Sequence, residues 1–137
     1  PMPLTHSTLI AAPPRAVFAL YARPQDWPHW DTELRAVDLP QGLVPGATGW
    51  LTPAKGPRAR ITVTEVTPDR SFAVQSRLPL CRMTFDHHLT PQGSGTLAQH
   101  SVQFTGPLAF VFRRLIGPMI ARALPASLAG LQAAVEA

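Results

Sequence analysis

Apolar and polar residues alternate in short stretches over most of this chain and recur at helical spacing only near its C-terminal end. Alternation with a period of two is typical of half-buried strands. It predicts seven strands, at residues 4–12, 34–39, 48–52, 58–66, 72–78, 82–89 and 96–104. Because short loops without helices join the later strands, the sheet is expected to be antiparallel.

Two short helices are predicted between the first two strands. Pro13 and Pro14 end the first strand and favour a helix start, because the N–H that proline lacks has no partner in a first helical turn. An apolar face follows, made of Val17, Phe18, Leu20 and Tyr21. Residues 25–30 form a second short helix or a turn, limited by Pro28.

A long apolar helix is predicted from Pro107 to the C-terminal end. Its apolar residues recur at helical spacing, at Leu108, Phe112, Leu115, Met119, Ala123, Leu128, Leu131 and Val135. Pro118 allows a new helical start, and Pro125 is expected to kink or break the helix. Such a bend either opens the mouth of a cavity or simply follows the curvature of the sheet.

The turns and the order of elements predict the fold class. Residues 67–70 have turn chemistry, and residues 91–95 form the clearest hairpin loop. We therefore expect an α+β fold: a curved antiparallel sheet of six or seven strands wraps around a long C-terminal helix, with two short helices after the first strand. Such a sheet leaves a cavity suited to a small molecule.

Length, composition and charge narrow the class of protein. The 137 residues, 45% hydrophobic and 15% charged, predict one domain over 1–137. The net charge is +4, but the basic residues are scattered without the aromatic-lined stripe typical of nucleic-acid binding, so we expect no nucleic-acid partner. A single cysteine allows no disulfide within the chain and implies no redox compartment. Because the sequence shows no secretory signal and no apolar run of membrane-spanning length, we expect a cytoplasmic protein.

Strand alternation predicts which side chains face the cavity. The predicted ligand-binding residues are Trp30, Trp50, Val63, Phe72, Val74, Ser76, Met83, Phe85, Val102, Phe104, Phe112 and Met119. Most are apolar, as a ligand pocket requires. Trp30 has the alternative role of packing the short helices on the sheet, and Trp50 that of cross-strand packing.

Three polar residues on the same predicted face carry the candidate chemistry. His87 and His100, with Glu65, could act as a general acid/base set, because a buried histidine titrates near neutral pH. Alternatively, the histidines lie near the rim or bond to backbone carbonyls, and Glu65 faces solvent. An enzymatic role requires the histidines to point inward and to contact each other or Glu65.

Metal binding and nucleophilic catalysis find little support in the sequence. His87 and His88 are adjacent in a strand and therefore face opposite sides, and no cysteine or carboxylate has a usual zinc spacing. Cys81 has no evident activating base beside it. We therefore expect neither a metal nor another cofactor.

Five segments, in order, resemble the START/Bet v 1-like (SRPBCC) superfamily, in particular its polyketide cyclase/dehydrase-like branch. They are residues 10–18, Trp27-Pro28-His29-Trp30, residues 63–68, residues 89–96, and Gly106-Pro107-Leu108 before the helix. The resemblance covers essentially the whole chain and implies a helix-grip fold with a deep apolar cavity. It implies no catalytic residue, because the superfamily has no shared catalytic motif.

Two functions follow as hypotheses. The first is a carrier that holds a hydrophobic or aromatic ligand, such as a lipid or a polyketide. The alternative is a cyclase/dehydratase-type enzyme that uses His87 or His100 as general acid/base and folds its substrate into a reactive shape. The expected state is a monomer or homodimer without integral membrane association, although residues 110–116 could touch a membrane surface.

Overall fold

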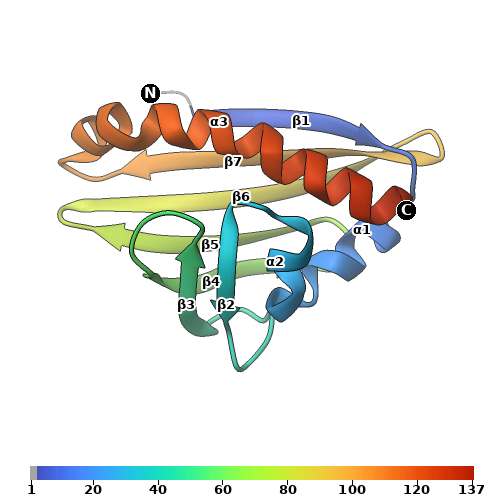
Figure 1. Cartoon of the computed structure of the whole chain (residues 1–137), viewed down its shortest axis with the longest axis horizontal. Coiled ribbons are helices and arrows are strands. Elements are labelled where there is room, and N and C mark those ends of the chain that lie inside the picture. The colour runs from blue at the N-terminus through green and yellow to red at the C-terminus, as the bar shows by residue number, and fades with distance from the viewer. Residues whose placement is uncertain (1–2) are drawn as a thin grey trace.

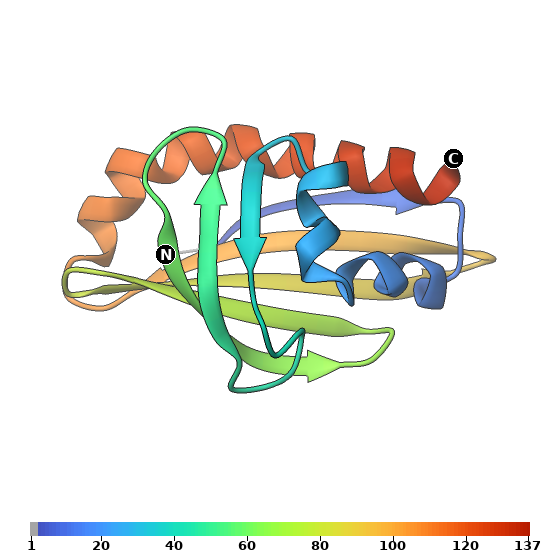
Figure 2. The same ribbon diagram turned by 60° about the horizontal axis from the view of Figure 1, so that its bottom comes forward.

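A computed structural model describes residues 3–137 as a curved antiparallel sheet with a long helix lying across it, which confirms the predicted α+β, helix-grip architecture (Figures 1 and 2). The seven strands pair in the order β1-β7-β6-β5-β4-β3-β2. Their bounds are β1 Leu4–Ile10, β2 Leu34–Asp38, β3 Thr48–Pro53, β4 Ala59–Thr67, β5 Ser71–Leu78, β6 Cys81–Gln92 and β7 Gly95–Thr105. Strands β2 to β7 form a meander, and β1 pairs with β7 at the far edge.

Helical segments occupy the two places where the sequence predicts them. Between β1 and β2 lie α1 (Pro14–Tyr21), a 3-10 turn η1 (Pro24–Asp26) and α2 (Trp27–Trp30). Proline occupies one of the first two positions of each of these three segments. Its missing N–H costs little in a first turn, so the prolines set where these helices begin.

The long helix α3 (Ala109–Glu136) runs without interruption through Pro118 and Pro125, so neither the new start nor the local break occurs. Each proline removes the hydrogen bond to the carbonyl four residues earlier. Those carbonyls belong to Arg114 and Ala121, which are both exposed. Both prolines therefore free a carbonyl on an exposed residue, and the helix continues past them.

α3 lies along the β1–β7 edge of the sheet, and its C-terminal half also meets α1 and α2. Two hydrogen bonds hold its last turns to β1 and the segment after it. Thr8 Oγ1 donates to Gln132 Oε1 at 3.2 Å, and the N–H of Ala11 donates to Glu136 Oε2 at 2.8 Å. The helix is thus fixed at one edge of the curved sheet.

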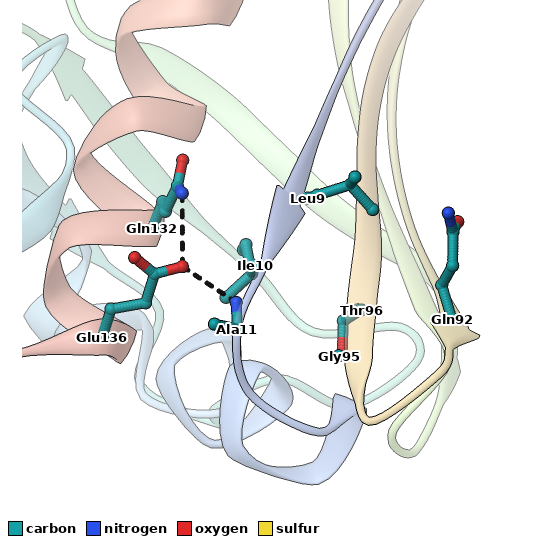
Figure 3. Close-up of a pocket in the computed structure, with 8 residues that line it drawn as sticks. All are labelled: Leu9, Ile10, Ala11, Gln92, Gly95, Thr96, Gln132 and Glu136. Carbon is teal, nitrogen blue, oxygen red and sulfur yellow. Dashed lines mark hydrogen bonds between the residues drawn. The ribbon is translucent and has the colours of Figure 1, made fainter.

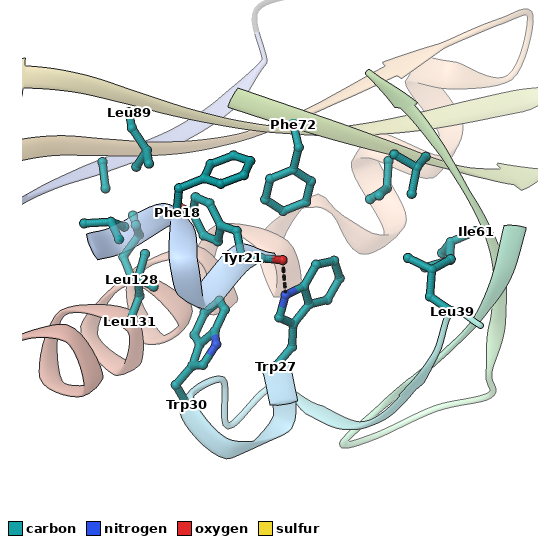
Figure 4. Close-up of a cluster of buried hydrophobic side chains, with 14 of the residues drawn as sticks. Phe18, Tyr21, Trp27, Trp30, Leu39, Ile61, Phe72, Leu89, Leu128 and Leu131 are labelled. Atoms are coloured by element: carbon teal, nitrogen blue, oxygen red, sulfur yellow. Dashed lines mark hydrogen bonds between the residues drawn. The ribbon is translucent and has the colours of Figure 1, made fainter. Parts of the chain in front are cut away.

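Two hydrophobic clusters fill the space between the sheet, α3 and the short helices. The larger, drawn in Figure 4, joins α1, α2 and the C-terminal half of α3 to the middle of the sheet, around Tyr21, Phe72 and Leu128. The smaller lies under the N-terminal half of α3, around Met83 and Phe104. Phe85 packs against both clusters and so marks their boundary.

Close backbone contact joins α2 to α3. A Cβ atom on Gly130 would overlap the carbonyl oxygen of Trp30, so only glycine allows this approach. One residue further on, the buried Asp31 carboxyl accepts hydrogen bonds from Ser127 Oγ at 2.8 Å and from the N–H of Glu33 at 3.0 Å. Desolvation raises the pKa of Asp31 above its usual value.

Gly130→Ala should destabilise the protein, although alanine is normally the better helix former. The added methyl forces α2 and α3 apart, and we expect a loss of about 1–3 kcal/mol of unfolding free energy in urea. Gly117→Ala is the matched control, because a Cβ there would meet only side chains of Arg113 and Leu4, at 3.7 Å. It should gain up to about 1 kcal/mol, and equal effects of the two substitutions would contradict this packing.

Candidate functional site

His87 and His100 face each other across β6 and β7 on the inner side of the sheet. Register pairs Phe72 with His87 and His87 with His100, so three neighbouring strands contribute one ring each to a single row. The rings of Phe72 and His87 are stacked, with centroids 3.9 Å apart and planes at 6°. The His87 and His100 rings meet edge to face, with centroids 4.5 Å apart.

Tyr21, at the end of α1, completes this group from above the sheet. Its hydroxyl lies 2.7 Å from His100 Nε2, a short hydrogen bond in a fully buried setting. The Tyr21 ring also packs against Phe72 and His87. Its backbone carbonyl accepts a hydrogen bond from Trp27 Nε1, drawn as a dashed line in Figure 4. We call Tyr21, His87 and His100 the Tyr–His–His cluster.

Burial keeps all three groups of the cluster uncharged near neutral pH. Desolvation lowers the pKa of His87 to about 3 and also holds the pKa of His100 well below its usual value. The same cause raises the pKa of Tyr21 far above its usual value. The cluster is therefore a neutral hydrogen-bonding group within an apolar interior.

Hydrogen bonding assigns the proton on His87. Its Nδ1 lies 3.3 Å from the carbonyl oxygen of Phe72, and because a carbonyl can only accept, Nδ1 carries the proton. The Nε2 atom of neutral His87 then holds a free lone pair. His87 also keeps part of its surface accessible, whereas His100 is only 4% exposed. His87 is thus the member of the cluster able to meet a molecule entering the interior.

Glu65 does not join the histidines but faces solvent, which is the second of the two possibilities that the sequence left open. The pairing of β4 with β5 shifts between Val63 and Glu65, because β4 contains a bulge there. One extra residue in a strand turns the following side chains to the other face. Glu65 is exposed on the outer face and accepts a hydrogen bond from Ser71 Oγ at 3.3 Å.

Trp50 also lies away from the inner face, although the sequence analysis assigned it to the ligand. It pairs with Arg60, which alternates with the buried Ile61 and therefore points outward. The guanidinium of Arg58 stacks 3.9 Å from the centre of the Trp50 ring, and that of Arg60 lies 5.3 Å from it. This cation–π contact accounts for Trp50 on the outer surface.

The structure gathers most of the remaining predicted ligand-binding residues on one face. Strand pairing aligns them in rows across the sheet: Val63, Val74, Phe85 and Val102, then Ser76, Met83 and Phe104. From α3, Phe112 packs on the smaller cluster, whereas Met119 is 53% exposed. Trp30 is buried near Tyr21, and its Nε1 has no hydrogen-bond partner within residues 3–137.

Sequence reasoning missed two residues of the site, Tyr21 and Trp27. Tyr21 could have been suspected, because it is the only tyrosine and ends a helix with an apolar face. Nothing in the local pattern shows that its hydroxyl reaches a strand 79 residues away. The Ser127–Asp31 hydrogen bond likewise joins residues 96 positions apart.

Two pockets open at opposite ends of the long β6–β7 pair. One, of about 390 Å³, lies between β1, the β6–β7 hairpin and the end of α3, and includes Gln132 and Glu136 (Figure 3). The other, of about 500 Å³, lies beside the β5–β6 turn. Side chains of the two hydrophobic clusters occupy the space predicted for a ligand.

Cys81 is buried in the smaller cluster, and burial raises the pKa of its thiol. Within residues 3–137, no three His, Cys, Asp or Glu side chains are grouped to hold a metal ion. None of the helices in this part of the chain combines the length and apolar character needed to cross a bilayer.

Comparison with known proteins identifies relatives over the whole chain. The profile of the family described as "Polyketide cyclase / dehydrase and lipid transport" matches residues 3–136. This match confirms the resemblance inferred from the five sequence segments. No curated protein matches the chain in sequence.

Solved structures share the fold at low sequence identity. NE0264 from Nitrosomonas europaea has a TM-score of 0.79 at 17% identity, over 98% of this chain and 94% of that one. TTHA0849 from Thermus thermophilus has a TM-score of 0.74 at 18% identity, over 98% of this chain and 97% of that one. Ara h 8.0201 has a TM-score of 0.65 at 11% identity, over 98% of this chain and 97% of that one. The fold is therefore Bet v 1-like.

Acidification should destabilise the protein through the two buried histidines. The unfolded chain takes up protons on histidine below about pH 6.5, whereas folded His87 stays neutral until about pH 3. The unfolded state binds more protons in this window, so the free energy of unfolding decreases as the pH is lowered. The decrease is at most about 1.4 kcal/mol per pH unit for each histidine. The raised pKa of Asp31 acts in the opposite direction.

His87→Phe should therefore reduce the loss of unfolding free energy between about pH 6.5 and pH 4.5. Urea unfolding at several pH values measures this loss. The phenyl ring keeps the stacking on Phe72. His88→Phe is the matched control, because His88 is exposed next to it on the other face. An unchanged slope in His87→Phe would show that His87 does not carry this linkage.

Proposed function

Because the chain belongs to the polyketide cyclase / dehydrase and lipid transport family, we propose that it binds a hydrophobic or aromatic small molecule between the inner face of its sheet and α3. The whole chain acts as one ligand-binding domain, a carrier for a lipid-like or polyketide-like compound. The ligand carries at least one polar oxygen, for which the Tyr–His–His cluster provides hydrogen bonds.

One observation carries this proposal: the inner face of the sheet is apolar from β4 to β7, and its main polar feature is the Tyr–His–His cluster. Ile61, Val63, Val74, Met83 and Val102 are all buried on that face. An apolar surface with a few convergent polar groups is the usual composition of a small-molecule site. The apolar surface supplies affinity, and the cluster orients the ligand.

Entry of a ligand requires side chains to move, because the two hydrophobic clusters fill the interior. Phe85 is the best candidate for this movement, since it is only partly buried and lies where the two clusters meet. Met83 beside it is flexible and adapts to different shapes. Displacing Phe85 would open a path to Val74 and Val102, which pair with it on the neighbouring strands.

A second function, cyclase or dehydratase chemistry, is supported by the geometry of the same cluster. Neutral His87 can accept a proton at Nε2, and it is the more accessible of the two histidines. His100 contacts His87 and is hydrogen-bonded to Tyr21, so it positions His87 and polarises its surroundings. General acid–base catalysis contributes about 10²–10⁴-fold to a rate when the pKa of the group lies near the working pH. This role therefore requires the bound substrate to raise the pKa of His87 from its value of about 3 in the empty site.

This proposal includes no cofactor, no metal and no nucleic-acid partner. The site that it describes consists of neutral and apolar groups, whereas nucleic-acid surfaces are strongly basic. A cytoplasmic location and a monomeric or homodimeric state belong to the same proposal.

Native mass spectrometry of protein purified from its own host, with extraction under denaturing conditions, tests the binding function first. A stoichiometric apolar ligand is expected, and the ligand should then raise the melting temperature of the empty protein. Phe85→Ala should speed uptake of the ligand several-fold, because it removes the side chain that must move aside to open the path to Val74 and Val102. Phe110→Ala is the control, because Phe110 is 68% exposed. The proposal would be contradicted if the purified protein carried no ligand and bound none of a panel of fatty acids and aromatic polyketides.

Product analysis of a poly-β-ketone substrate separates the enzymatic function from simple binding. If the protein is a cyclase, His87→Gln should lower its rate about 100-fold or more while ligand affinity changes little. Tyr21→Phe, which leaves His100 without its hydroxyl partner, should give an intermediate loss. His29→Gln, on the exposed surface of α2, should keep the full rate. Equal product with and without the protein would leave only the carrier function.

A further inference from the structure

Two arginines lie directly opposite each other at the β5–β6 end of the sheet. Arg77 and Arg82 are register partners, both are exposed, and both line the pocket of about 500 Å³ beside the turn. Like charges in directly opposed strand positions repel each other and destabilise a sheet. An anionic group bound between them would remove that repulsion, so the pair indicates a site for a negatively charged partner.

Leu80, in the turn that follows Arg77, is an unfavourable residue for the stability of that turn. Leu80 has φ 53°, in the left-handed region where glycine or asparagine is favoured. Its side chain is 66% exposed at the tip of a two-residue hairpin. A large apolar residue there costs backbone energy and exposes apolar surface to water. Its presence is accounted for if Leu80 contacts an apolar partner.

The start of α3 adds more exposed apolar surface at the same end of the molecule. Figures 1 and 2 both show the β5–β6 turn beside the start of α3, and the N–H of Leu108 donates to the carbonyl of Leu80 at 3.0 Å. In the first two turns of α3, Phe110 is 68% exposed and Leu115 is 71% exposed, with the exposed Arg114 between them.

Charge at this end has one sign. No Asp or Glu occurs in residues 77–82 or 105–116, the segments that form this surface. Exposed apolar side chains surrounded by basic residues are typical of surfaces that lie on anionic membranes, where arginines bind lipid phosphates and apolar side chains enter the acyl boundary. A soluble acidic protein would match the arginines but offers less reason for three large exposed apolar residues.

We propose that this end of the molecule, formed by Arg77, Leu80, Arg82, Phe110, Arg114 and Leu115, docks reversibly on anionic phospholipid membranes. Lipid phosphate occupies the pocket between Arg77 and Arg82, and Leu80 and Phe110 enter the bilayer surface. A carrier of apolar ligands would collect or deliver its ligand there. The docking itself needs no bound ligand, so it can be tested apart from the ligand-binding proposal.

Vesicle flotation tests the proposal directly. The ligand-free protein is mixed with vesicles of phosphatidylcholine alone or with about 30 mol% phosphatidylglycerol, at low and at near-physiological salt. We expect association with the anionic vesicles only, weaker at the higher salt concentration. A separate titration with glycerol phosphate reports whether the pocket binds a soluble phosphate without a membrane.

Substitutions separate the two parts of the surface. Arg77→Gln with Arg82→Gln should weaken vesicle partition about 25-fold, since each basic residue near an anionic surface contributes about fivefold. Leu80→Asn should weaken it as well, while raising the melting temperature by about 2–5 °C, because asparagine suits the left-handed turn position better. Opposite effects on binding and stability distinguish a contact residue from a structural one.

Matched controls lie at the other end of the sheet. Arg15→Gln with Arg70→Gln removes the same charge from exposed positions, and Leu9→Ser removes an exposed leucine. All three sites should tolerate change without loss of vesicle partition. Equal weakening by these controls, equal association with neutral vesicles, or glycerol phosphate binding without vesicle association would each overturn the proposal.

Discussion

The hydrogen bond between Tyr21 and His100 is the constraint on which the arrangement of the interior depends. A buried hydroxyl and a buried imidazole are each costly without a partner, and at 2.7 Å they satisfy one another. The bond ties the end of α1 to β7, and the Tyr21 ring then packs against Phe72 and His87 on β5 and β6. One polar contact therefore sets the height of the short helices above the sheet.

The position of α3 follows from this arrangement. Once α1 and α2 are placed, Trp30 and Asp31 present a carbonyl and a carboxyl to the helix, and only Gly130 and Ser127 can meet them. The C-terminal half of α3 is thus held by backbone and polar contacts, whereas its N-terminal half packs by apolar contact with Met83, Phe104 and their neighbours. Apolar packing has fewer directional demands than hydrogen bonding, so a ligand would displace the N-terminal half more readily.

The proposed roles use different parts of one architecture. The inner face of the sheet offers apolar area with one neutral polar cluster, which suits an uncharged or weakly polar ligand. The β5–β6 end instead offers arginines and exposed apolar side chains, next to the N-terminal half of α3. A surface that contacts a membrane close to the less constrained half of the helix would place ligand exchange and docking side by side.

Alternation, turn residues and helical spacing by themselves determined the order of elements and the antiparallel sheet, and they placed His87 and His100 on the same face, because these properties depend on near neighbours in the chain. Tertiary structure alone decided the rest. A single bulge in β4 turned Glu65 outward, α3 continued through both of its prolines, and the side chains of two hydrophobic clusters packed between the sheet and the helices. The Tyr21–His100 contact spans 79 residues, and no local pattern encodes a distance that only the packed sheet and helices create.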